Sequence, residues 1–321
     1  MQHFKALIQQ FAQHFDTAHF PEHPLHLYQP CDYFLSLGGK RIRPVLCLLG
    51  NDLFAPLHPD VYELATAVEL FHNFTLIHDD IMDDASLRRG METVHTKYGT
   101  NVALLSGDVM LIRAYEYINR LQPHYLQRIL TIFNTTAKQV CEGQQLDMDF
   151  EKYTNVSFDE YVHMIGLKTS VLLAGSLEMG GIIGGASDTD LAHLYQFGLN
   201  LGIAFQIQDD YLDAFGNPET FGKEVGGDIK QNKKTFLLIH ALDVANAEQR
   251  QQLYQLMEQN PPDKVAQILS IFTACNVDAW ANSLKENYLQ KAYAHLEAIQ
   301  VAPERKIALQ ELAAYLIVRV Q

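Results

Sequence analysis

Two clusters of aspartates are the residues in this sequence whose type and spacing could bind a metal ion. The first cluster, at the end of a strongly apolar segment, consists of Asp79, Asp80, Asp83 and Asp84. Asp79 and Asp83 are four residues apart, so in a helix both carboxylates lie on one face, where their repulsion destabilises the helix. Mg²⁺ prefers such oxygens, usually one or two carboxylates together with water and substrate phosphates. The cluster therefore predicts a magnesium site.

The same arrangement recurs later in the chain. Asp209, Asp210 and Asp213 end the apolar run that begins at Phe205, again with two carboxylates four residues apart. A solvated helix end would be the simpler interpretation of one acidic pair. It is disfavoured here because aspartate interacts unfavourably with the negative end of a helix, and because the pattern occurs twice after apolar segments. We therefore expect carboxylates from two helices to converge on Mg²⁺.

Basic residues lie close to these clusters in the sequence. Gly38–Pro44 places three cations after two glycines at the expected start of a helix, where backbone N–H groups and the helix dipole favour a phosphate. Arg88 and Arg89 follow the first cluster, and the basic segments within 222–235 follow the second. Lys168 lies inside an apolar helix, where a lysine is costly unless it is paired. A short basic patch alone is usually surface, but cations alternating with aspartate clusters indicate a polyphosphate site.

The bulk properties exclude several other functions. The 321 residues carry a net charge of −14, and 48% of them are hydrophobic, which fits a globular chain with a sizeable core. An acidic chain lacks the basic surface that non-specific binding of nucleic acid or anionic lipid requires. The four cysteines are widely separated and form neither a disulfide framework nor a zinc motif. Without a signal peptide or a bilayer-spanning apolar stretch, we expect a cytoplasmic protein with no stable membrane insertion.

Helical periodicity positions the candidate residues. The segment 60–80 repeats apolar residues every three or four positions, with Asp60 as the expected N-cap and Glu63 completing a capping box. Similar patterns cover about 101–121, 124–150, 157–185, 188–214, 229–245 and 303–319. Strand signals are nearly absent, and no flexible linker divides the chain. We predict an all-α fold in a single domain over 1–321, with helices that are apolar nearly all round at its centre.

The ordered motifs resemble those of the trans-isoprenyl diphosphate synthases, the family of farnesyl, geranylgeranyl and polyprenyl diphosphate synthases. The resemblance covers about residues 35–240. It is carried by Gly38–Pro44, His72, Leu76–Asp84, Arg88–Gly90, Thr93–His95, Gly143–Asp147, Lys168–Thr169, Phe205–Asp213, Gly222–Lys223 and Lys233–Thr235. One Asp-Asp-x-x-Asp motif is weak evidence, whereas this ordered set is highly specific.

The resemblance implies an all-α fold around a deep central cavity, usually in a homodimer, with two facing aspartate motifs that hold three Mg²⁺ on the allylic diphosphate. The chain would then be a Mg²⁺-dependent short-chain prenyltransferase. It would condense isopentenyl diphosphate head to tail with dimethylallyl, geranyl or farnesyl diphosphate and release diphosphate. The implied metal set is Asp79, Asp80, Asp83, Asp209, Asp210 and Asp213. Within this set Asp79, Asp83 and Asp209 would bind metal, and the other three would support them.

The same resemblance implies two diphosphate sites. The allylic diphosphate would be bound by Arg88, Lys168, Lys223 and Lys233. Isopentenyl diphosphate would be bound by Gly39, Lys40, Arg43, His72 and Arg89. The catalytic residues would be Lys168, Thr169 and Gln206, of which the last two face the developing carbocation. Because ionisation of the allylic C–O bond creates a diphosphate and a cation, this chemistry needs electrostatic stabilisation and no nucleophilic side chain.

Product length is gauged in this family by the residues four, five and eight positions before the first aspartate, which here are Thr75, Phe74 and Phe71. A large ring closes the tunnel for the growing chain, and a small residue deepens it. Phe74 is the aromatic seen in short-chain members, whereas Phe71 could equally be ordinary core. The pattern favours geranylgeranyl diphosphate (C20) as the product, with farnesyl diphosphate (C15) as the alternative and a longer product after that.

Three rival functions share part of the pattern. A terpene cyclase would carry an Asn/Ser/Glu metal motif in place of the second aspartate cluster and would have no use for Gly38–Arg41. A head-to-head synthase would show Asp-x-x-x-Asp motifs without an isopentenyl diphosphate site. A non-catalytic subunit of a heteromeric synthase would have lost one aspartate motif or the isopentenyl cations, and both are intact here.

Overall fold

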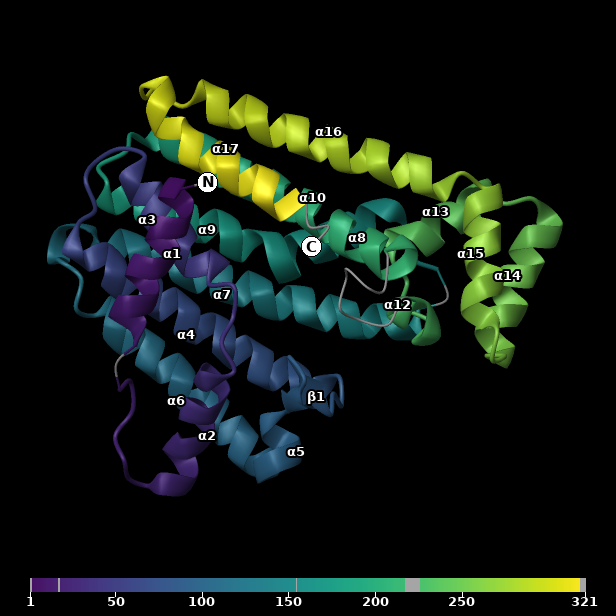
Figure 1. Cartoon of the computed structure of the whole chain (residues 1–321), viewed down its shortest axis with the longest axis horizontal. Helices are drawn as coiled ribbons and strands as arrows, with labels where there is room; N and C mark the ends of the chain where they lie inside the picture. Colours follow the sequence, from purple (N-terminus) through teal and green to yellow (C-terminus); the bar gives the residue numbers. More distant parts are fainter. Residues whose placement is uncertain (1, 17, 154, 217–225, 318–321) are drawn as a thin grey trace. The chain divides into compact units, whose positions relative to one another are not determined.

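The protein folds almost entirely into helices, as the sequence predicts. The computed structural model describes residues 2–16, 18–153, 155–216 and 226–317 (Figure 1). The elements in these residues are α1 (Gln2–Phe15), α2 (Leu25–Ser36), α3 (Ile42–Asp52), α4 (Pro59–Met82), β1 (Leu87–Arg88), β2 (Met91–Glu92), α5 (Val94–Tyr98), α6 (Thr100–Ile118), α7 (Pro123–Lys152), α8 (Phe158–Ile165), the π-helical turn η1 (Gly166–Ser170), α9 (Val171–Ile183), α10 (Asp188–Phe215), α12 (Gly227–Lys230), α13 (Phe236–Val244), α14 (Ala247–Gln259), α15 (Lys264–Ala274), α16 (Val277–Ala298) and α17 (Pro303–Ile317).

The chain divides into two compact units. Unit 1 consists of residues 1–135, 175–194 and 300–309, and unit 2 consists of residues 136–174, 195–299 and 310–321. The single domain over 1–321 expected from the sequence stays a prediction. Within the described residues, no helix combines the length and the apolar character needed to cross a bilayer.

Unit 1 is organised around α4. This helix packs along α6, and α3 packs against it as well (Figure 1). Val61, Leu64, Val68 and Phe71 of α4 are buried in this packing. Because α4 ends at Met82, the first aspartate cluster lies where the buried helix emerges. The packing of α4 thus fixes the position of Asp79 and Asp80.

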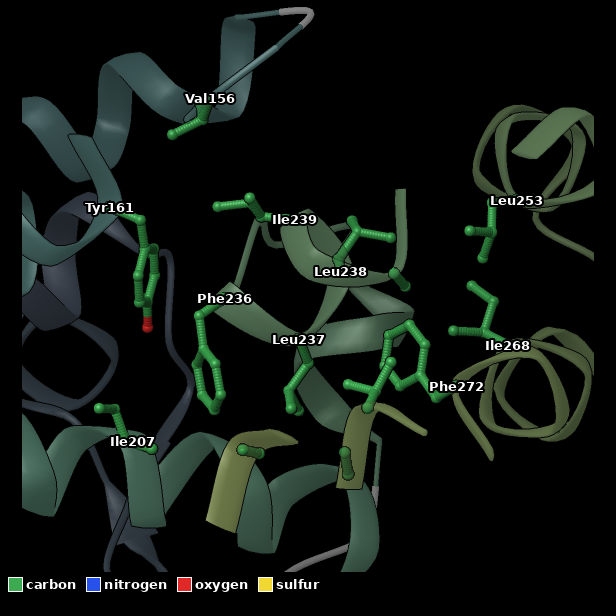
Figure 2. Close-up of a cluster of buried hydrophobic side chains, with 14 of the residues drawn as sticks. Val156, Tyr161, Ile207, Phe236, Leu237, Leu238, Ile239, Leu253, Ile268 and Phe272 are labelled. Carbon is green, nitrogen blue, oxygen red and sulfur yellow. The ribbon is translucent and has the colours of Figure 1, made fainter. Parts of the chain in front are cut away.

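Unit 2 has a hydrophobic core built around the short helix α13. Figure 2 shows Phe236, Leu237 and Leu238 of this helix among side chains from several other helices, including Leu253 of α14 and Phe272 of α15. Helix α13 also packs against α8, which carries Tyr161. Since Phe236 and Phe272 are almost fully buried, residues of α13, α14, α15 and α8 form one hydrophobic core.

The observed helices agree with most of the predicted ranges and correct three details. The N-cap of α4 is His58, whose Nδ1 accepts from the Asp60 backbone N–H, and not Asp60 as predicted. The predicted helix 157–185 is divided by the π-helical turn η1. The predicted helix 229–245 is two helices, because the residues between Lys230 and Phe236 form a turn that carries Lys233. Helices α1, α2, α5, α14, α15 and α16 lie outside the predicted ranges.

Candidate functional site

In unit 1 the first aspartate cluster contains one buried and several accessible carboxylates. Asp80 is 1% exposed, and both of its oxygens accept hydrogen bonds from the Arg88 guanidinium at 2.6–2.9 Å. Asp83 is exposed at the C-cap of α4, and Asp79 is partly exposed one turn earlier. A carboxylate engaged on both oxygens by an arginine is poorly placed to bind a metal directly. The supporting role expected for Asp80 fits this geometry, with Arg88 as the group that it orients.

A tight hairpin sets the positions of Arg88 and Arg89. Strands β1 and β2 pair antiparallel, with Arg88 opposite Met91. The two residues between the strands, Arg89 and Gly90, have φ of 55° and 79°. Positive φ at both central residues is the type I′ turn, which an arginine adopts only at a cost in backbone strain. The hairpin therefore holds two consecutive arginines just after the aspartate cluster.

The glycine-rich loop before α3 lies against this hairpin. A Cβ on Gly39 would lie 3.1 Å from a terminal nitrogen of Arg89, and Gly39 has a φ of 157°. A bare backbone at this position therefore lets the loop approach the Arg89 guanidinium closely. The structure thus brings together Gly39 and Arg89, two residues that the sequence assigned to isopentenyl diphosphate. Lys40 is exposed next to them.

Arg41 anchors the same loop from inside. It adopts a left-handed conformation with φ of 52°, and its guanidinium forms an ion pair with Glu69, which is 4% exposed. Glu69 also accepts from Asn73 Nδ2 at 3.0 Å, and the Arg41 guanidinium lies 4.8 Å over the Phe15 ring. A buried ion pair that has further hydrogen bonds tolerates desolvation. Arg41, which the sequence placed among the phosphate-binding cations, thus holds the loop that carries Lys40 and Arg43.

His72 is a neutral hydrogen-bond acceptor in this cluster. Its Nε2 lies 3.0 Å from an Arg43 terminal nitrogen, and arginine can only donate, so Nε2 is unprotonated. Burial, followed by the positive charges of Arg43, Arg89, Arg88 and Arg41, holds the pKa of His72 well below its usual range. Two of these four arginines, Arg41 and Arg88, are ion-paired with Glu69 and Asp80, so the positive charge around the imidazole exceeds the negative charge. An excess of positive charge suits a diphosphate.

In unit 2, Lys168 and Thr169 lie on the π-helical turn η1. This widened turn points their side chains away from the regular helical positions, and π-turns are frequent at functional sites. The Lys168 ammonium lies 2.5 Å from Asp147 Oδ2 of α7. A Cβ on Gly143 would lie 2.3 Å from the Lys168 backbone nitrogen, so only glycine lets α7 approach η1 this closely. The Gly143–Asp147 motif therefore positions Lys168 through both its first and its last residue.

The second aspartate cluster also contains one buried carboxylate. Asp210 is 6% exposed and accepts hydrogen bonds from Gln206 Nε2 at 2.8 Å and from the Tyr161 hydroxyl. Burial, followed by the negative charge of Asp228, raises the pKa of Asp210 to about 8. Thr169 Oγ1 donates to Gln206 Oε1 at 3.3 Å. The structure thus joins Thr169, Gln206 and Asp210, all predicted site residues, in one chain of hydrogen bonds.

Asp213 organises the segment that follows the second cluster. Its Oδ2 accepts from the Asp228 backbone N–H at 3.0 Å, at the start of α12. The Asp228 carboxylate in turn lies 3.6 Å from the Lys233 ammonium. Burial raises the pKa of Asp228, and Lys233 opposes that shift. Asp213 therefore supports the segment that carries Lys233, whereas Lys223, also assigned to the allylic diphosphate, lies outside the described residues.

A cavity of about 130 Å³ opens among these residues of unit 2. Lys168, Thr169 and Gln206 line it together with Lys233, Asp210 and Tyr161. Its wall combines ammonium groups that can bind an anion with hydroxyl and amide oxygens that can face a cation. The cavity therefore contains the three predicted catalytic residues.

Carboxylate oxygens make both aspartate clusters chemically suited to Mg²⁺. Asp79, Asp83 and Asp209 are all partly or fully exposed to solvent. In the part of the chain that the structure describes, no three His, Cys, Asp or Glu side chains are grouped to hold a metal ion by themselves. Metal binding by Asp79, Asp83 and Asp209, with Asp80, Asp210 and Asp213 in support, therefore stays a prediction, in which diphosphate and water would supply the other ligands.

Three residues of these clusters were missed by sequence reasoning. Tyr161 and Asp228 lie outside the predicted site, and Glu69 was treated as part of an ordinary helix repeat. A single tyrosine at a buried position in a helix gives no sign in the sequence that its hydroxyl meets a carboxylate far along the chain. Glu69 did carry a usable signal, because a glutamate amid buried apolar residues of α4 needs a partner.

Comparisons with known proteins agree with the motifs. Residues 24–273 match the family model described as polyprenyl synthetase. The chain is 35% identical over 297 residues to a short chain isoprenyl diphosphate synthase of Methanothermobacter thermautotrophicus, covering 92% of this chain and 91% of the relative. It is 35% identical to a geranylgeranyl diphosphate synthase of Methanosarcina mazei, with 92% and 90% covered. A crystal structure of a geranylgeranyl pyrophosphate synthase superposes with a TM-score of 0.93 at 42% identity, covering 99% of both chains.

The environment of His72 predicts an imidazole that stays neutral in mildly acidic solution. A free histidine is half protonated near pH 6.5. The side-chain nitrogen resonances of His72, assigned by comparison with His72→Gln, should therefore stay constant from pH 8 to about pH 6. The tautomer observed should carry its proton on Nδ1. A titration midpoint at or above pH 6.5 would contradict the assignment of Nε2 as an acceptor.

Proposed function

Because the chain belongs to the polyprenyl synthetase family, we propose that it condenses isopentenyl diphosphate head to tail with an allylic diphosphate and releases diphosphate. The arginine-rich cluster of unit 1 carries this proposal, because four arginines and an acceptor histidine suit a diphosphate in an otherwise acidic chain. The names of the two relatives and of the matching crystal structure support a short-chain activity. The two aspartate motifs favour this activity over that of a terpene cyclase or a head-to-head synthase.

The isopentenyl diphosphate site of the proposal is in unit 1. Arg43 and Arg89 would bind the diphosphate through charge-assisted hydrogen bonds, with Lys40 as a further cation. Neutral His72 donates from Nδ1, because Nε2 already accepts from Arg43. Gly39 leaves the backbone open beside Arg89. The ion pair between Arg41 and Glu69 would keep this loop in place when substrate enters.

The allylic diphosphate would be bound by Arg88, Lys168, Lys233 and the undescribed Lys223. Lys168 and Lys233 each have a carboxylate neighbour, Asp147 and Asp228 respectively. As the allylic C–O bond breaks, these cations stabilise the negative charge that develops on the leaving diphosphate. Mg²⁺ bound to the diphosphate through Asp79, Asp83 and Asp209 would supply Lewis-acid stabilisation of the same charge.

Oxygen atoms of the cavity would face the allylic cation. Thr169 donates its proton to Gln206 Oε1, so the lone pairs of the hydroxyl are left for a positive charge. Both oxygens stabilise a cation without bonding to it. The π electrons of isopentenyl diphosphate then form the new C–C bond, and a proton is lost, which the released diphosphate can accept. No side chain is consumed as a nucleophile in this scheme.

The reaction itself is the direct test. Purified protein is incubated with Mg²⁺, labelled isopentenyl diphosphate and dimethylallyl, geranyl or farnesyl diphosphate, and products are separated by chain length. We expect a C20 product from each starter, and complete loss of product when EDTA removes the metal. Absence of product with all three starters would overturn the proposal and favour a non-catalytic subunit.

Product length in this proposal depends on Phe74. Phe71 is only 1% exposed and packs at 5.3 Å between ring centroids on Phe133, so it belongs to the core of unit 1. Phe74, five residues before Asp79, is less buried, and its ring lies 4.7 Å from the His78 ring between centroids. Thr75 bonds back to the His72 carbonyl oxygen at 2.8 Å and presents no large group. Phe74 is therefore the ring assigned to end the growing chain.

Replacing the Phe74 ring should lengthen the product. Phe74→Ala removes the ring proposed to close the tunnel, so products longer than C20 should dominate the chromatogram. Phe71→Leu is the matched control, because it alters a core ring and should lower thermal stability with product length unchanged. An unchanged product from Phe74→Ala would contradict the assignment.

The proposal includes a homodimer. Helix α6 of unit 1 exposes Leu105 by 60% and Ile112 by 58%, and seven residues of spacing place both on one face. An exposed apolar stripe of this kind suits an interface between two copies of the chain.

Charges on that stripe should dissociate the dimer. The double variant Leu105→Glu with Ile112→Glu is expected to elute with a mass near the monomer value of 36.4 kDa in light-scattering chromatography. Ile307→Glu, at a residue 50% exposed on α17, is the matched control and should remain dimeric. A double variant that keeps the wild-type mass would place the interface elsewhere.

A further inference from the structure

The hydroxyl of Tyr161 is a buried polar group that the mechanism above does not use. Tyr161 is 4% exposed, and its ring packs against Phe236 with 6.1 Å between centroids. Figure 2 shows the ring beside Phe236, with the hydroxyl directed toward the helix that carries Ile207. There the hydroxyl donates to Asp210 Oδ2. Burying a hydroxyl costs free energy that a phenylalanine at this position would not cost, so a role for the hydroxyl is expected.

Asp210 connects the Tyr161 hydroxyl to Gln206. Its second oxygen, Oδ1, accepts from Gln206 Nε2 at 2.8 Å. Because Oδ1 accepts from Nε2, this contact holds one of the two orientations of the Gln206 amide. The amide nitrogen faces Asp210, and the carbonyl oxygen faces Thr169 and the cavity.

The orientation of this amide matters for a cation in the cavity. The carbonyl oxygen carries a partial negative charge, whereas the amide hydrogens carry partial positive charges. Rotation of the amide by half a turn would replace attraction for a developing cation by repulsion. Preorganised dipoles of this kind contribute to catalysis because they need no rearrangement as charge develops.

We propose that Tyr161 is a positioning residue for the condensation. Through Asp210 it holds the Gln206 amide with its carbonyl oxygen toward Thr169 and the cavity. Helix α8 is fixed for this task by the capping box of Ser157 and Glu160 at its N-terminus and by its packing against α13. This inference rests on the proposed function for its kinetic consequence, but the orientation of the amide can be tested without turnover.

The kinetic test removes the hydroxyl and keeps the ring. Tyr161→Phe should lower kcat about tenfold, the size expected when one buried hydrogen bond that positions a catalytic group is lost. KM for both diphosphates should change less than about twofold, because the Tyr161 hydroxyl is hydrogen-bonded to Asp210 and Tyr161 is not among the residues assigned to either diphosphate. Tyr254→Phe, at a tyrosine 42% exposed in the same unit, is the control and should leave kcat unchanged.

A double variant separates positioning from general stability. If Tyr161 acts through Gln206, then Tyr161→Phe should cost less than about twofold in kcat when Gln206→Leu is already present. A purely structural role would give the same loss in both backgrounds, which would overturn the proposal. A loss confined to KM would overturn it as well.

A readout without activity keeps the test independent of the proposed function. The side-chain amide resonance of Gln206, assigned with Gln206→Leu, should show slow hydrogen exchange in the wild type, because Nε2 is bonded to a buried carboxylate. Tyr161→Phe should speed that exchange, and Tyr254→Phe should not. Fast exchange in the wild type would overturn the inference even if Tyr161→Phe fails to fold. If the wild type condenses no diphosphates but shows this protection, the proposed function alone fails.

Discussion

A charged group that leaves water needs a partner, and this requirement organises the functional residues of both units. In unit 1, Asp80 and Glu69 are almost fully buried, and each is paired with an arginine near residues proposed to bind diphosphate. In unit 2, Asp210 is buried among donors, and burial raises its pKa. These buried carboxylates orient the side chains that they contact. Asp80 and Glu69 each hold an arginine guanidinium, and Asp210 holds the Gln206 amide.

Unusual backbone conformations also help to orient side chains of the candidate site. Arg41 and Arg89 both have positive φ, and Lys168 and Thr169 lie on a π-helical turn. Each of these conformations costs free energy in isolation, of the order of 1–3 kcal/mol for a strained residue. They persist because surrounding packing holds them, for example the contact of Gly143 with the Lys168 backbone. Arg89 and Lys168 are residues proposed to bind a diphosphate, and Arg41 supports the loop beside Arg89, so fixed geometry at these three positions has a chemical use.

Two aromatic residues of α4, about one turn apart, differ in burial. Phe71 faces the interior and packs on Phe133, while Phe74 is less buried and contacts His78. His78 Nε2 lies 3.2 Å from the Leu104 carbonyl oxygen, which links α4 to α6. The position of Phe74 is therefore set by the same contact between helices that stabilises unit 1. Because Phe74 also packs on Phe71, with 5.7 Å between ring centroids, the ring proposed to end the growing chain borders the core of unit 1.

The sequence alone determined the helical class, most of the long helices, the family and the candidate binding residues, because periodicity and ordered motifs are local properties of the chain. It could not show that Arg41 pairs with Glu69, that Tyr161 meets Asp210, or that a π-helical turn interrupts the helix around Lys168. Those contacts join residues far apart in the sequence or depend on packing that competes with regular helix geometry. The two aspartate motifs were visible from the start, yet only the tertiary structure decided which carboxylates are buried and paired and which are exposed, because burial is a property of the packed helices and not of any one segment.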